Sequence, residues 1–170
     1  MSIFNMVLPG SPAPTPTEEY TISKYPASYT TSGSTIQGTR YKNAIGKGAD
    51  TEAVSGNDYS KSSSSTASIN YAFDFSEIPD NAVIKGMSVS VKGHRESASQ
   101  GTASLVIYHT GTNHNYSTVT SFTSTSAQVL EMNITELPTR QDLRQMALRF
   151  TIGYYGGLVN GATWTVTYET

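Results

Sequence analysis

Large apolar residues alternate with small or polar residues in several segments of the chain. The most regular stretch consists of Ile69, Asn70, Tyr71, Ala72, Phe73, Asp74 and Phe75. A period of two is typical of a β-strand with one buried face. Residues 79–81, Pro-Asp-Asn, have the composition of a turn, and apolar residues return at every second position from Met87 to Val91. Residues 69–93 therefore predict two strands joined as an antiparallel hairpin.

Further strands follow from the same reasoning. Alternation or continuous apolar runs predict them at residues 18–24, 103–109, 118–122, 128–134, 146–154 and 162–168. Repeated glycines interrupt the pattern between residues 25 and 68, where only short strands are expected, near residues 35–41 and 52–54. Gly156-Gly157 and Asn160-Gly161 have the composition of turns.

One short helix is predicted to begin at Thr139 and to end by residue 145. Thr139 can accept a hydrogen bond from a free N–H group of the first turn, and Asp142 suits the positive end of the helix dipole. Strands at this spacing with a single helix are typical of an all-β fold. The predicted architecture is an antiparallel β-sandwich, jelly-roll-like, with one short helix.

The apolar face changes side within residues 83–91. Val83, Met87, Val89 and Val91 share one face of a regular strand, but Ile84 falls on the other face. A β-bulge inserts one residue and restores the register of such a strand. We therefore predict a bulge near residues 85–86, where a glycine would relieve the backbone.

The first 17 residues differ from the rest of the chain. Four prolines, at positions 9, 12, 14 and 16, limit backbone hydrogen bonding and favour an extended conformation. We expect residues 1–17 to form a flexible Pro-rich N-terminal arm and residues 18–170 to form a single β-sandwich domain. Two interpretations of the arm stay open. It is either a frayed terminus or a docking arm that places apolar side chains on a neighbouring subunit, namely Ile3, Phe4, Met6, Val7 and Leu8.

Composition excludes several classes of protein. The formal net charge of −2 supplies no electrostatic attraction for nucleic acid or an anionic membrane. No apolar run approaches the roughly 20 residues that a membrane helix needs. The apolar residues 3–8 lack a basic flank and are too short for a signal peptide. The absence of cysteine excludes disulfides, thiolate nucleophiles and cysteine-ligated metals.

No motif in the chain predicts a reaction. His109 and His114 would need a third ligand to hold a metal, and no carboxylate lies near them in sequence. The Gly-rich residues 44–51, AIGKGADT, lack the spacing and the Ser or Thr of a phosphate-binding loop. No serine stands in a nucleophile motif. We expect no enzymatic activity and no catalytic, metal-binding or cofactor-binding residues.

Four tyrosines lie in or beside predicted loops and are the candidate contacts for a ligand or partner. They are Tyr41, Tyr59, Tyr116 and Tyr155. An exposed tyrosine can stack on a sugar ring or anchor a protein partner. The alternative is that they are ordinary tyrosines of a β-protein surface without a binding role.

Residues 73–86 have the sequence FDFSEIPDNAVIKG, which fits the pattern F-x-F-x-x-I-P-x-x-A-x-I-x-G. This segment resembles a hairpin of small β-sandwich modules in phage virion proteins. Looser matches are Asn43-Ala44, Asp50, Tyr59 and the closing residues 164–168. The chain is similar to β-sandwich accessory proteins encoded in the tail-gene region of Bacillus-infecting siphophages, whose fold is similar to a domain of lactococcal phage receptor-binding proteins.

The resemblance implies a non-enzymatic structural or interaction protein of the phage tail, at the tail tip or baseplate, that assists host attachment. It implies location in the virion after synthesis in the host cytoplasm without a signal peptide, and contacts with other tail proteins or with further copies of the chain. The alternative function is a carbohydrate-binding module that recognises host-surface glycans. A concave sheet face with several exposed aromatics would favour glycan binding. A flat apolar patch, or an N-terminal arm ordered on a neighbour, would favour assembly.

Overall fold

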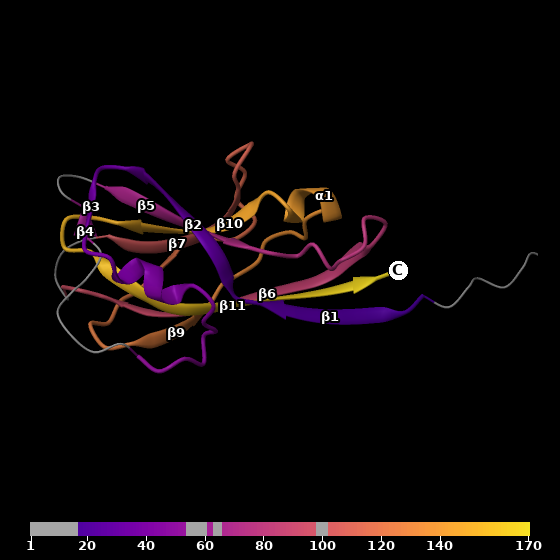
Figure 1. The fold of residues 1–170 in the computed structure, drawn as a ribbon, viewed down its shortest axis with the longest axis horizontal. Coiled ribbons are helices and arrows are strands. Elements are labelled where there is room, and N and C mark those ends of the chain that lie inside the picture. Colours follow the sequence, from indigo (N-terminus) through magenta and orange to yellow (C-terminus); the bar gives the residue numbers. More distant parts are fainter. Residues whose placement is uncertain (1–16, 54–60, 63–65, 98–101) are drawn as a thin grey trace, which may run out of the picture.

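The computed structural model of the protein describes residues 17–53, 61–62, 66–97 and 102–170 (Figure 1). One sheet has the strand order β1 (Glu19–Lys24), β11 (Gly157–Glu169), β6 (Val83–Arg95) and β9 (Gln128–Glu131). The other has the order β2 (Pro26–Gly33), β5 (Ala67–Phe73), β10 (Met146–Ile152), β7 (Ala103–His109) and β8 (Thr120–Ser121). The remaining elements are β3 (Ile36–Gln37), which pairs with β4 (Lys61–Ser62), the 3-10 helix η1 (Arg40–Ala44) and the helical turn α1 (Arg140–Leu143).

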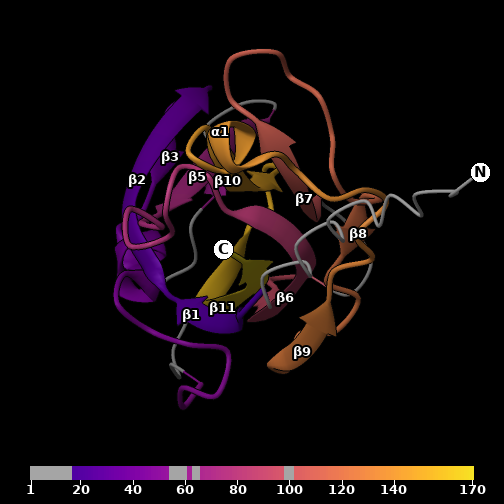
Figure 2. The ribbon, with the colours of Figure 1, turned by 90° about the vertical axis from the view of Figure 1, so that its right-hand side faces the viewer.

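The two sheets pack face to face as a sandwich, as the view in Figure 2 shows. All strand pairs within them are antiparallel. The chain crosses from one sheet to the other at most steps, for example from β1 to β2, from β6 to β7 and from β10 to β11. Such crossings are the Greek-key connections of a jelly roll. Without β5, each sheet has four strands in jelly-roll order, so the predicted fold class is confirmed.

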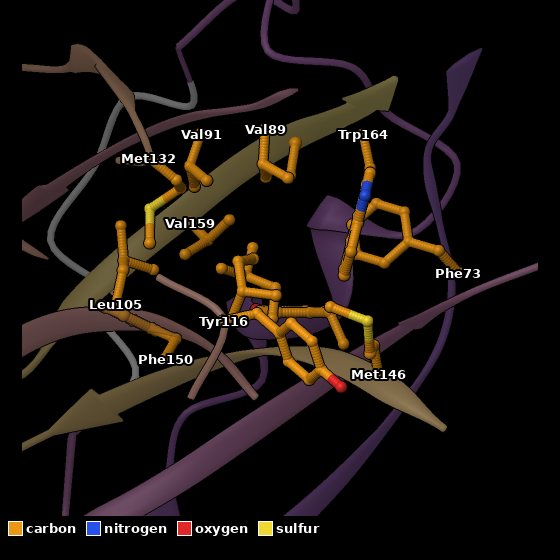
Figure 3. Close-up of a cluster of buried hydrophobic side chains, with 14 of the residues drawn as sticks. Phe73, Val89, Val91, Leu105, Tyr116, Met132, Met146, Phe150, Val159 and Trp164 are labelled. Atoms are coloured by element: carbon orange, nitrogen blue, oxygen red, sulfur yellow. The ribbon is translucent and has the colours of Figure 1, made fainter. Parts of the chain in front are cut away.

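The core lies between the sheets and is rich in aromatic side chains (Figure 3). Trp164 of β11 is fully buried. Its ring meets Phe73 and Phe75 edge-on, with ring centroids 5.0 Å and 5.6 Å away. Phe122 contacts Phe150 in the same manner at 6.0 Å. The contact between Trp164 and Phe73 joins the two sheets, and aromatic burial of this kind contributes strongly to core stability.

The predicted hairpin at residues 69–93 is wrong. The strands at its two ends, β5 and β6, lie in different sheets, and residues 74–82 cross between the sheets. Phe75 and Ile78 are buried within this crossing segment. Period-two alternation identifies strands but does not show which strands pair. Two large apolar residues in the connection favour a path across the core over a tight turn in solvent.

The predicted bulge near residues 85–86 is confirmed. Gly86 pairs with Thr167 and Ile84 pairs with Tyr168, so Lys85 is the extra residue. Ile84 is thereby buried, and the side chain of Val83 is 58% exposed. The expected role of glycine is wrong, however. A Cβ added to Gly86 would meet Thr167 at 3.5 Å, an ordinary contact, and its backbone does not have positive φ.

Several element boundaries also differ from expectation. The Ser/Thr-rich strand β2 was not predicted, because most of its side chains are exposed and show no apolar alternation. Of the strand expected near residues 35–41, residues 36–37 form β3 and residues 40–41 belong to η1. Residues 52–53 of the strand expected at 52–54 are not in a strand. Asn160-Gly161 is not a turn but a bulge within β11. The predicted capping by Thr139 and Asp142 is confirmed at α1.

Candidate functional site

Polar side chains converge at one end of the sandwich, around the turn α1. Thr139 and Asp142 form a reciprocal capping box there. The Thr139 hydroxyl accepts a hydrogen bond from the Asp142 backbone N–H at 3.1 Å, and the Asp142 carboxylate accepts one from the Thr139 N–H at 3.2 Å. The Thr139 hydroxyl also lies 2.7 Å from that carboxylate. This network lowers the pKa of Asp142, with the Thr139 hydrogen bond as the main cause.

Arg140 is buried, with 5% of its surface exposed. Its Nε donates to the carbonyl oxygen of Ile78 at 2.8 Å, and Nη2 donates to that of Phe75 at 3.0 Å. The guanidinium therefore attaches α1 to the segment that crosses between β5 and β6. Burial, the main cause, and the neighbouring Arg144 lower the pKa of Arg140.

Two cavities include Arg140 in their lining. One, of about 290 Å³, is lined by four polar residues, Asp80, Arg140, Gln141 and Arg144, and we call it the polar cavity. The other, of about 330 Å³, is mainly apolar and is lined by Ala82, Val83, Ile84, Leu137, Pro138, Thr139 and Arg140. Arg144 and Asp80, which both line the polar cavity, form an ion pair. An anionic or apolar group of a partner could be accommodated at this end of the molecule.

The ring of His109 also faces the carboxylate of Asp142. Its Nε2 lies 3.8 Å from Asp142 Oδ1, and its Nδ1 accepts hydrogen bonds from the N–H groups of Gly111 and Thr112 at 3.1 Å and 3.2 Å. Tyr116 also hydrogen-bonds to Asp142, and burial together with this carboxylate raises the pKa of Tyr116. Both histidine nitrogens are thus directed at fixed partners. The arrangement holds a loop against α1 and leaves no free lone pair on His109 to act as a base.

The other two histidines have separate environments. His114 contacts Glu136, and its backbone carbonyl accepts a hydrogen bond from the His109 N–H at 2.8 Å. His94 is buried, and burial lowers its pKa, partly offset by a hydrogen bond with Asn160. Within the described ranges, no group of three His, Asp or Glu side chains is placed to hold a metal ion. The same residues contain no helix long and apolar enough to cross a membrane.

The structure places the tyrosines that were predicted as ligand or partner contacts in different environments. Tyr41 is partly buried and packs edge-on against Tyr29 at 5.1 Å. Tyr155 is exposed and contacts Tyr154 at 5.3 Å. Tyr116 is only 8% exposed and lies among the core side chains in Figure 3, so the expectation that it is a surface contact is wrong. Its ring lies edge-on to His114, which a local sequence pattern does not reveal. Tyr59 and the candidate docking residues Ile3, Phe4, Met6, Val7 and Leu8 lie outside the described residues.

The Gly-rich residues 44–51 pack against β11 through their backbone. The carbonyl of Lys47 accepts a hydrogen bond from the Ala162 N–H at 3.0 Å, and the N–H of Ala49 donates to the Thr163 hydroxyl at 3.0 Å. A Cβ on Gly161 would lie 2.3 Å from the Gly48 carbonyl oxygen. The glycines therefore permit a close backbone approach, as expected for a structural Gly-rich loop.

An apolar surface at one end of the sandwich was not predicted. The ends of β1, β6 and β11 extend past the strands of the second sheet (Figure 1), and we call them the projecting end. Tyr20 pairs with Tyr168 and Tyr168 with Ile84 across these strands. The exposed fractions of Tyr20, Val83 and Leu137 are 41%, 58% and 46%. Val83 and Leu137 line the same apolar cavity, so this end presents apolar side chains to solvent around a recess.

Comparison of the chain with protein-family models, curated proteins and solved structures found no match.

Proposed function

We propose that the protein is a non-enzymatic structural or interaction component of a phage tail, located at the tail tip or baseplate, where it assists host attachment. The observation that carries this proposal is the projecting end, where Val83 and Leu137 are exposed beside an apolar cavity of about 330 Å³. Exposed apolar side chains gathered around a recess favour a protein interface. The resemblance of residues 73–86 to phage virion modules suggests the kind of assembly.

The contacts of His109 support binding over catalysis. His109 Nδ1 accepts from two backbone N–H groups, and Nε2 faces Asp142. A general base needs a lone pair directed at a substrate. In this arrangement the polar residues of the α1 end serve to fix the surface around the projecting end.

Glycan binding is the second candidate, and the exposed pair Tyr154 and Tyr155 favours it. Their rings lie edge-on at 5.3 Å in the turn between β10 and β11. Exposed aromatic rings can stack on sugars. The pair lies in a turn and not on a concave sheet face, so assembly remains the first proposal.

The test uses virions assembled in cells that express tagged variants of the full chain. We expect the tagged wild-type protein in purified virions, detected by immunogold labelling at the tail tip. The double variant Val83→Glu, Leu137→Glu should be lost from virions. Val129→Glu, at an equally exposed valine on the edge strand β9, is the matched control and should be retained.

Absence of the wild-type protein from virions would overturn the tail proposal. Binding of the isolated protein to host cells, lost in a Tyr154→Ala, Tyr155→Ala variant but not in the Val83, Leu137 variant, would instead support glycan recognition. All variants should first show the wild-type circular dichroism spectrum.

A further inference from the structure

Among the described strands, β1 is the outer strand of its sheet, and its edge away from β11 offers backbone hydrogen-bonding groups. The ladder with β11 is regular from Glu19 to Lys24. The carbonyl of Glu18 accepts a hydrogen bond from the Thr170 N–H at 3.3 Å. Because strand residues alternate in direction, the backbone groups of residues 18, 20, 22 and 24 point toward β11, and those of residues 19, 21 and 23 point away from it.

This edge carries few of the devices that normally protect an outer strand. Residues 18–24 contain no proline, and the pairing of β1 shows no bulge. Among the described elements, none pairs with the outer side of β1, and Figure 1 shows the strand at the lower border of the molecule. An exposed, regular edge of six residues is a template for a further strand.

The side chains of β1 complement those of a second β1 when the two strands pair antiparallel with Thr21 at the centre. In an antiparallel ladder, directly opposed residues must both point toward the partner or both away from it. Centring the pairing on Thr21 satisfies this condition and sets opposite charges together. The pairs are Thr21 with Thr21, Tyr20 with Ile22, Glu19 with Ser23 and Glu18 with Lys24. Registers centred on Tyr20 or on Ile22 leave Lys24 without an acidic residue opposite it.

We infer that two copies of this chain associate antiparallel through β1, centred on Thr21, so that their four-stranded sheets join into one. The interface is isologous, and each unlike pair occurs twice by symmetry. Tyr20 already stacks on Tyr168, with ring centroids 5.5 Å apart. Ile22 of the second copy would pack against this ring, and aromatic–β-branched pairs across strands are stabilising.

The side chains on the other face of β1, those of Thr21 and Ser23, also favour this pairing. Hydroxyls of Thr21 and Thr167 lie 3.2 Å apart, and those of Ser23 and Thr165 lie 2.8 Å apart. A second Thr21 would extend this row of hydroxyls across the two-fold axis. Lys24 forms an ion pair with Glu77 at 2.5 Å, and its ammonium group has further N–H donors for a carboxylate of the second copy.

The first test is Thr21→Pro in the full chain, measured by sedimentation velocity over a range of protein concentrations. The variant removes an N–H that points away from β11, so the monomer should fold with the wild-type circular dichroism spectrum. We expect a dimer for the wild type and for the control Thr21→Val, and a monomer for Thr21→Pro. A monomeric wild type at its highest soluble concentration, or a dimeric Thr21→Pro, would overturn the inference.

Charge reversal tests the register and does not rely on proline. Glu18→Lys alone and Lys24→Glu alone should each weaken the dimer roughly tenfold, because each creates two like-charge contacts. The combined reversal should restore the affinity. Glu77→Gln is the control for the loss of the Lys24–Glu77 pair and should leave the dimer intact. Failure of the combined variant to restore dimerisation would overturn the register.

The inference is independent of the tail proposal, and its assay uses isolated protein. Absence from virions with an intact dimer would overturn only the tail proposal. A dimer that is lost on deletion of residues 1–16 but insensitive to Thr21→Pro would assign association to the N-terminal segment, and would overturn pairing through β1.

Discussion

At the scale of single residues, Arg140 joins two segments that lie more than 60 positions apart in the sequence. Its two hydrogen bonds to the carbonyls of Ile78 and Phe75 hold the crossing segment against α1. Removing it would take away the side-chain donors of both buried carbonyls, of which that of Phe75 keeps a hydrogen bond from the Ile78 N–H at 3.1 Å, and would open a cavity beneath α1. The residue lines both the polar and the apolar cavity and contributes to their shape.

We predict that Arg140→Ala lowers the free energy of unfolding by about 3 kcal/mol, because hydrogen bonds from a charged donor contribute about 1.5–3 kcal/mol each. Urea unfolding followed by tryptophan fluorescence would measure the change, since Trp164 lies in the core. Gln141→Ala, at an exposed position of the same turn, is the control and should change stability little. Equal effects of the two substitutions would contradict the role given to Arg140.

Asp142 connects stability to pH. Its pKa is lowered in the folded protein, so the unfolded chain binds the proton more readily and the contribution to stability is lost as pH falls. We predict that Asp142→Asn lowers the melting temperature at pH 7. The difference in melting temperature between this variant and the wild type should narrow below about pH 4. Thermal unfolding at a series of pH values would show this convergence.

Glu52→Gln is the matched control for the pH series, because Glu52 is an exposed carboxylate outside the α1 network. The melting temperature of this variant should stay close to that of the wild type at all pH values. A constant difference between Asp142→Asn and the wild type down to pH 2 would show that the carboxylate charge does not stabilise the capping box.

Residue-level roles were predictable where the chemistry is local. Thr139 and Asp142 stand three positions apart, and a capping box depends only on that spacing. The burial of Tyr116 and the carbonyl partners of Arg140 depend on segments distant in sequence. No local pattern contains that information, so the α1 end could not be assembled from the sequence alone.

At the scale of elements, two bulges on neighbouring strands each contain a glycine, but only one of them requires it. At the bulge in β6, a Cβ on Gly86 would have room beside Thr167 at 3.5 Å. At the bulge in β11, a Cβ on Gly161 would lie 2.3 Å from the backbone oxygen of Gly48. Backbone atoms cannot move aside as flexible side chains do, so the second site requires glycine.

We predict that Gly161→Ala destabilises the fold by about 3 kcal/mol, at the upper end of the usual cost of overpacking. Gly86→Ala should change stability by less than about 1 kcal/mol, since alanine replaces glycine in a strand without strain. Chemical denaturation of both variants under the same conditions would measure the two changes in the free energy of unfolding. Similar losses at the two positions would show that the bulge geometry itself, and not the approach of residues 44–51, requires glycine.

Strand existence was predicted better than strand pairing. Alternation predicted β5, β6, β10 and the second half of β11, because each buries one face. β2 was missed because both of its faces are largely polar and exposed. The crossing between β5 and β6 was mistaken for a hairpin, since the choice of partner strand is settled by packing of the whole sandwich and not by the connecting residues.

At the scale of the whole molecule, the core and the two sheets that the structure describes are formed by residues between 19 and 169. We therefore predict that deletion of residues 1–17 changes the melting temperature by no more than about 3 °C, which corresponds to at most about 1 kcal/mol for a domain of this size. Pairing through β1 should persist in the truncated protein, because Glu18 to Lys24 are retained. Calorimetry and sedimentation velocity measure the two properties separately.

The same truncation should weaken docking to other tail proteins. The removed segment includes Ile3, Phe4, Met6, Val7 and Leu8, and burying each such side chain on a partner contributes roughly 1.5–3 kcal/mol before ordering costs. A variant with Ile3, Phe4 and Leu8 replaced by serine keeps the chain length and the prolines, so it separates apolar contact from tether length. Loss of virion incorporation in both variants would identify the segment as a docking arm. If both variants are incorporated as the wild type is, the segment is a frayed terminus, and if the truncated protein unfolds, the domain begins before residue 18.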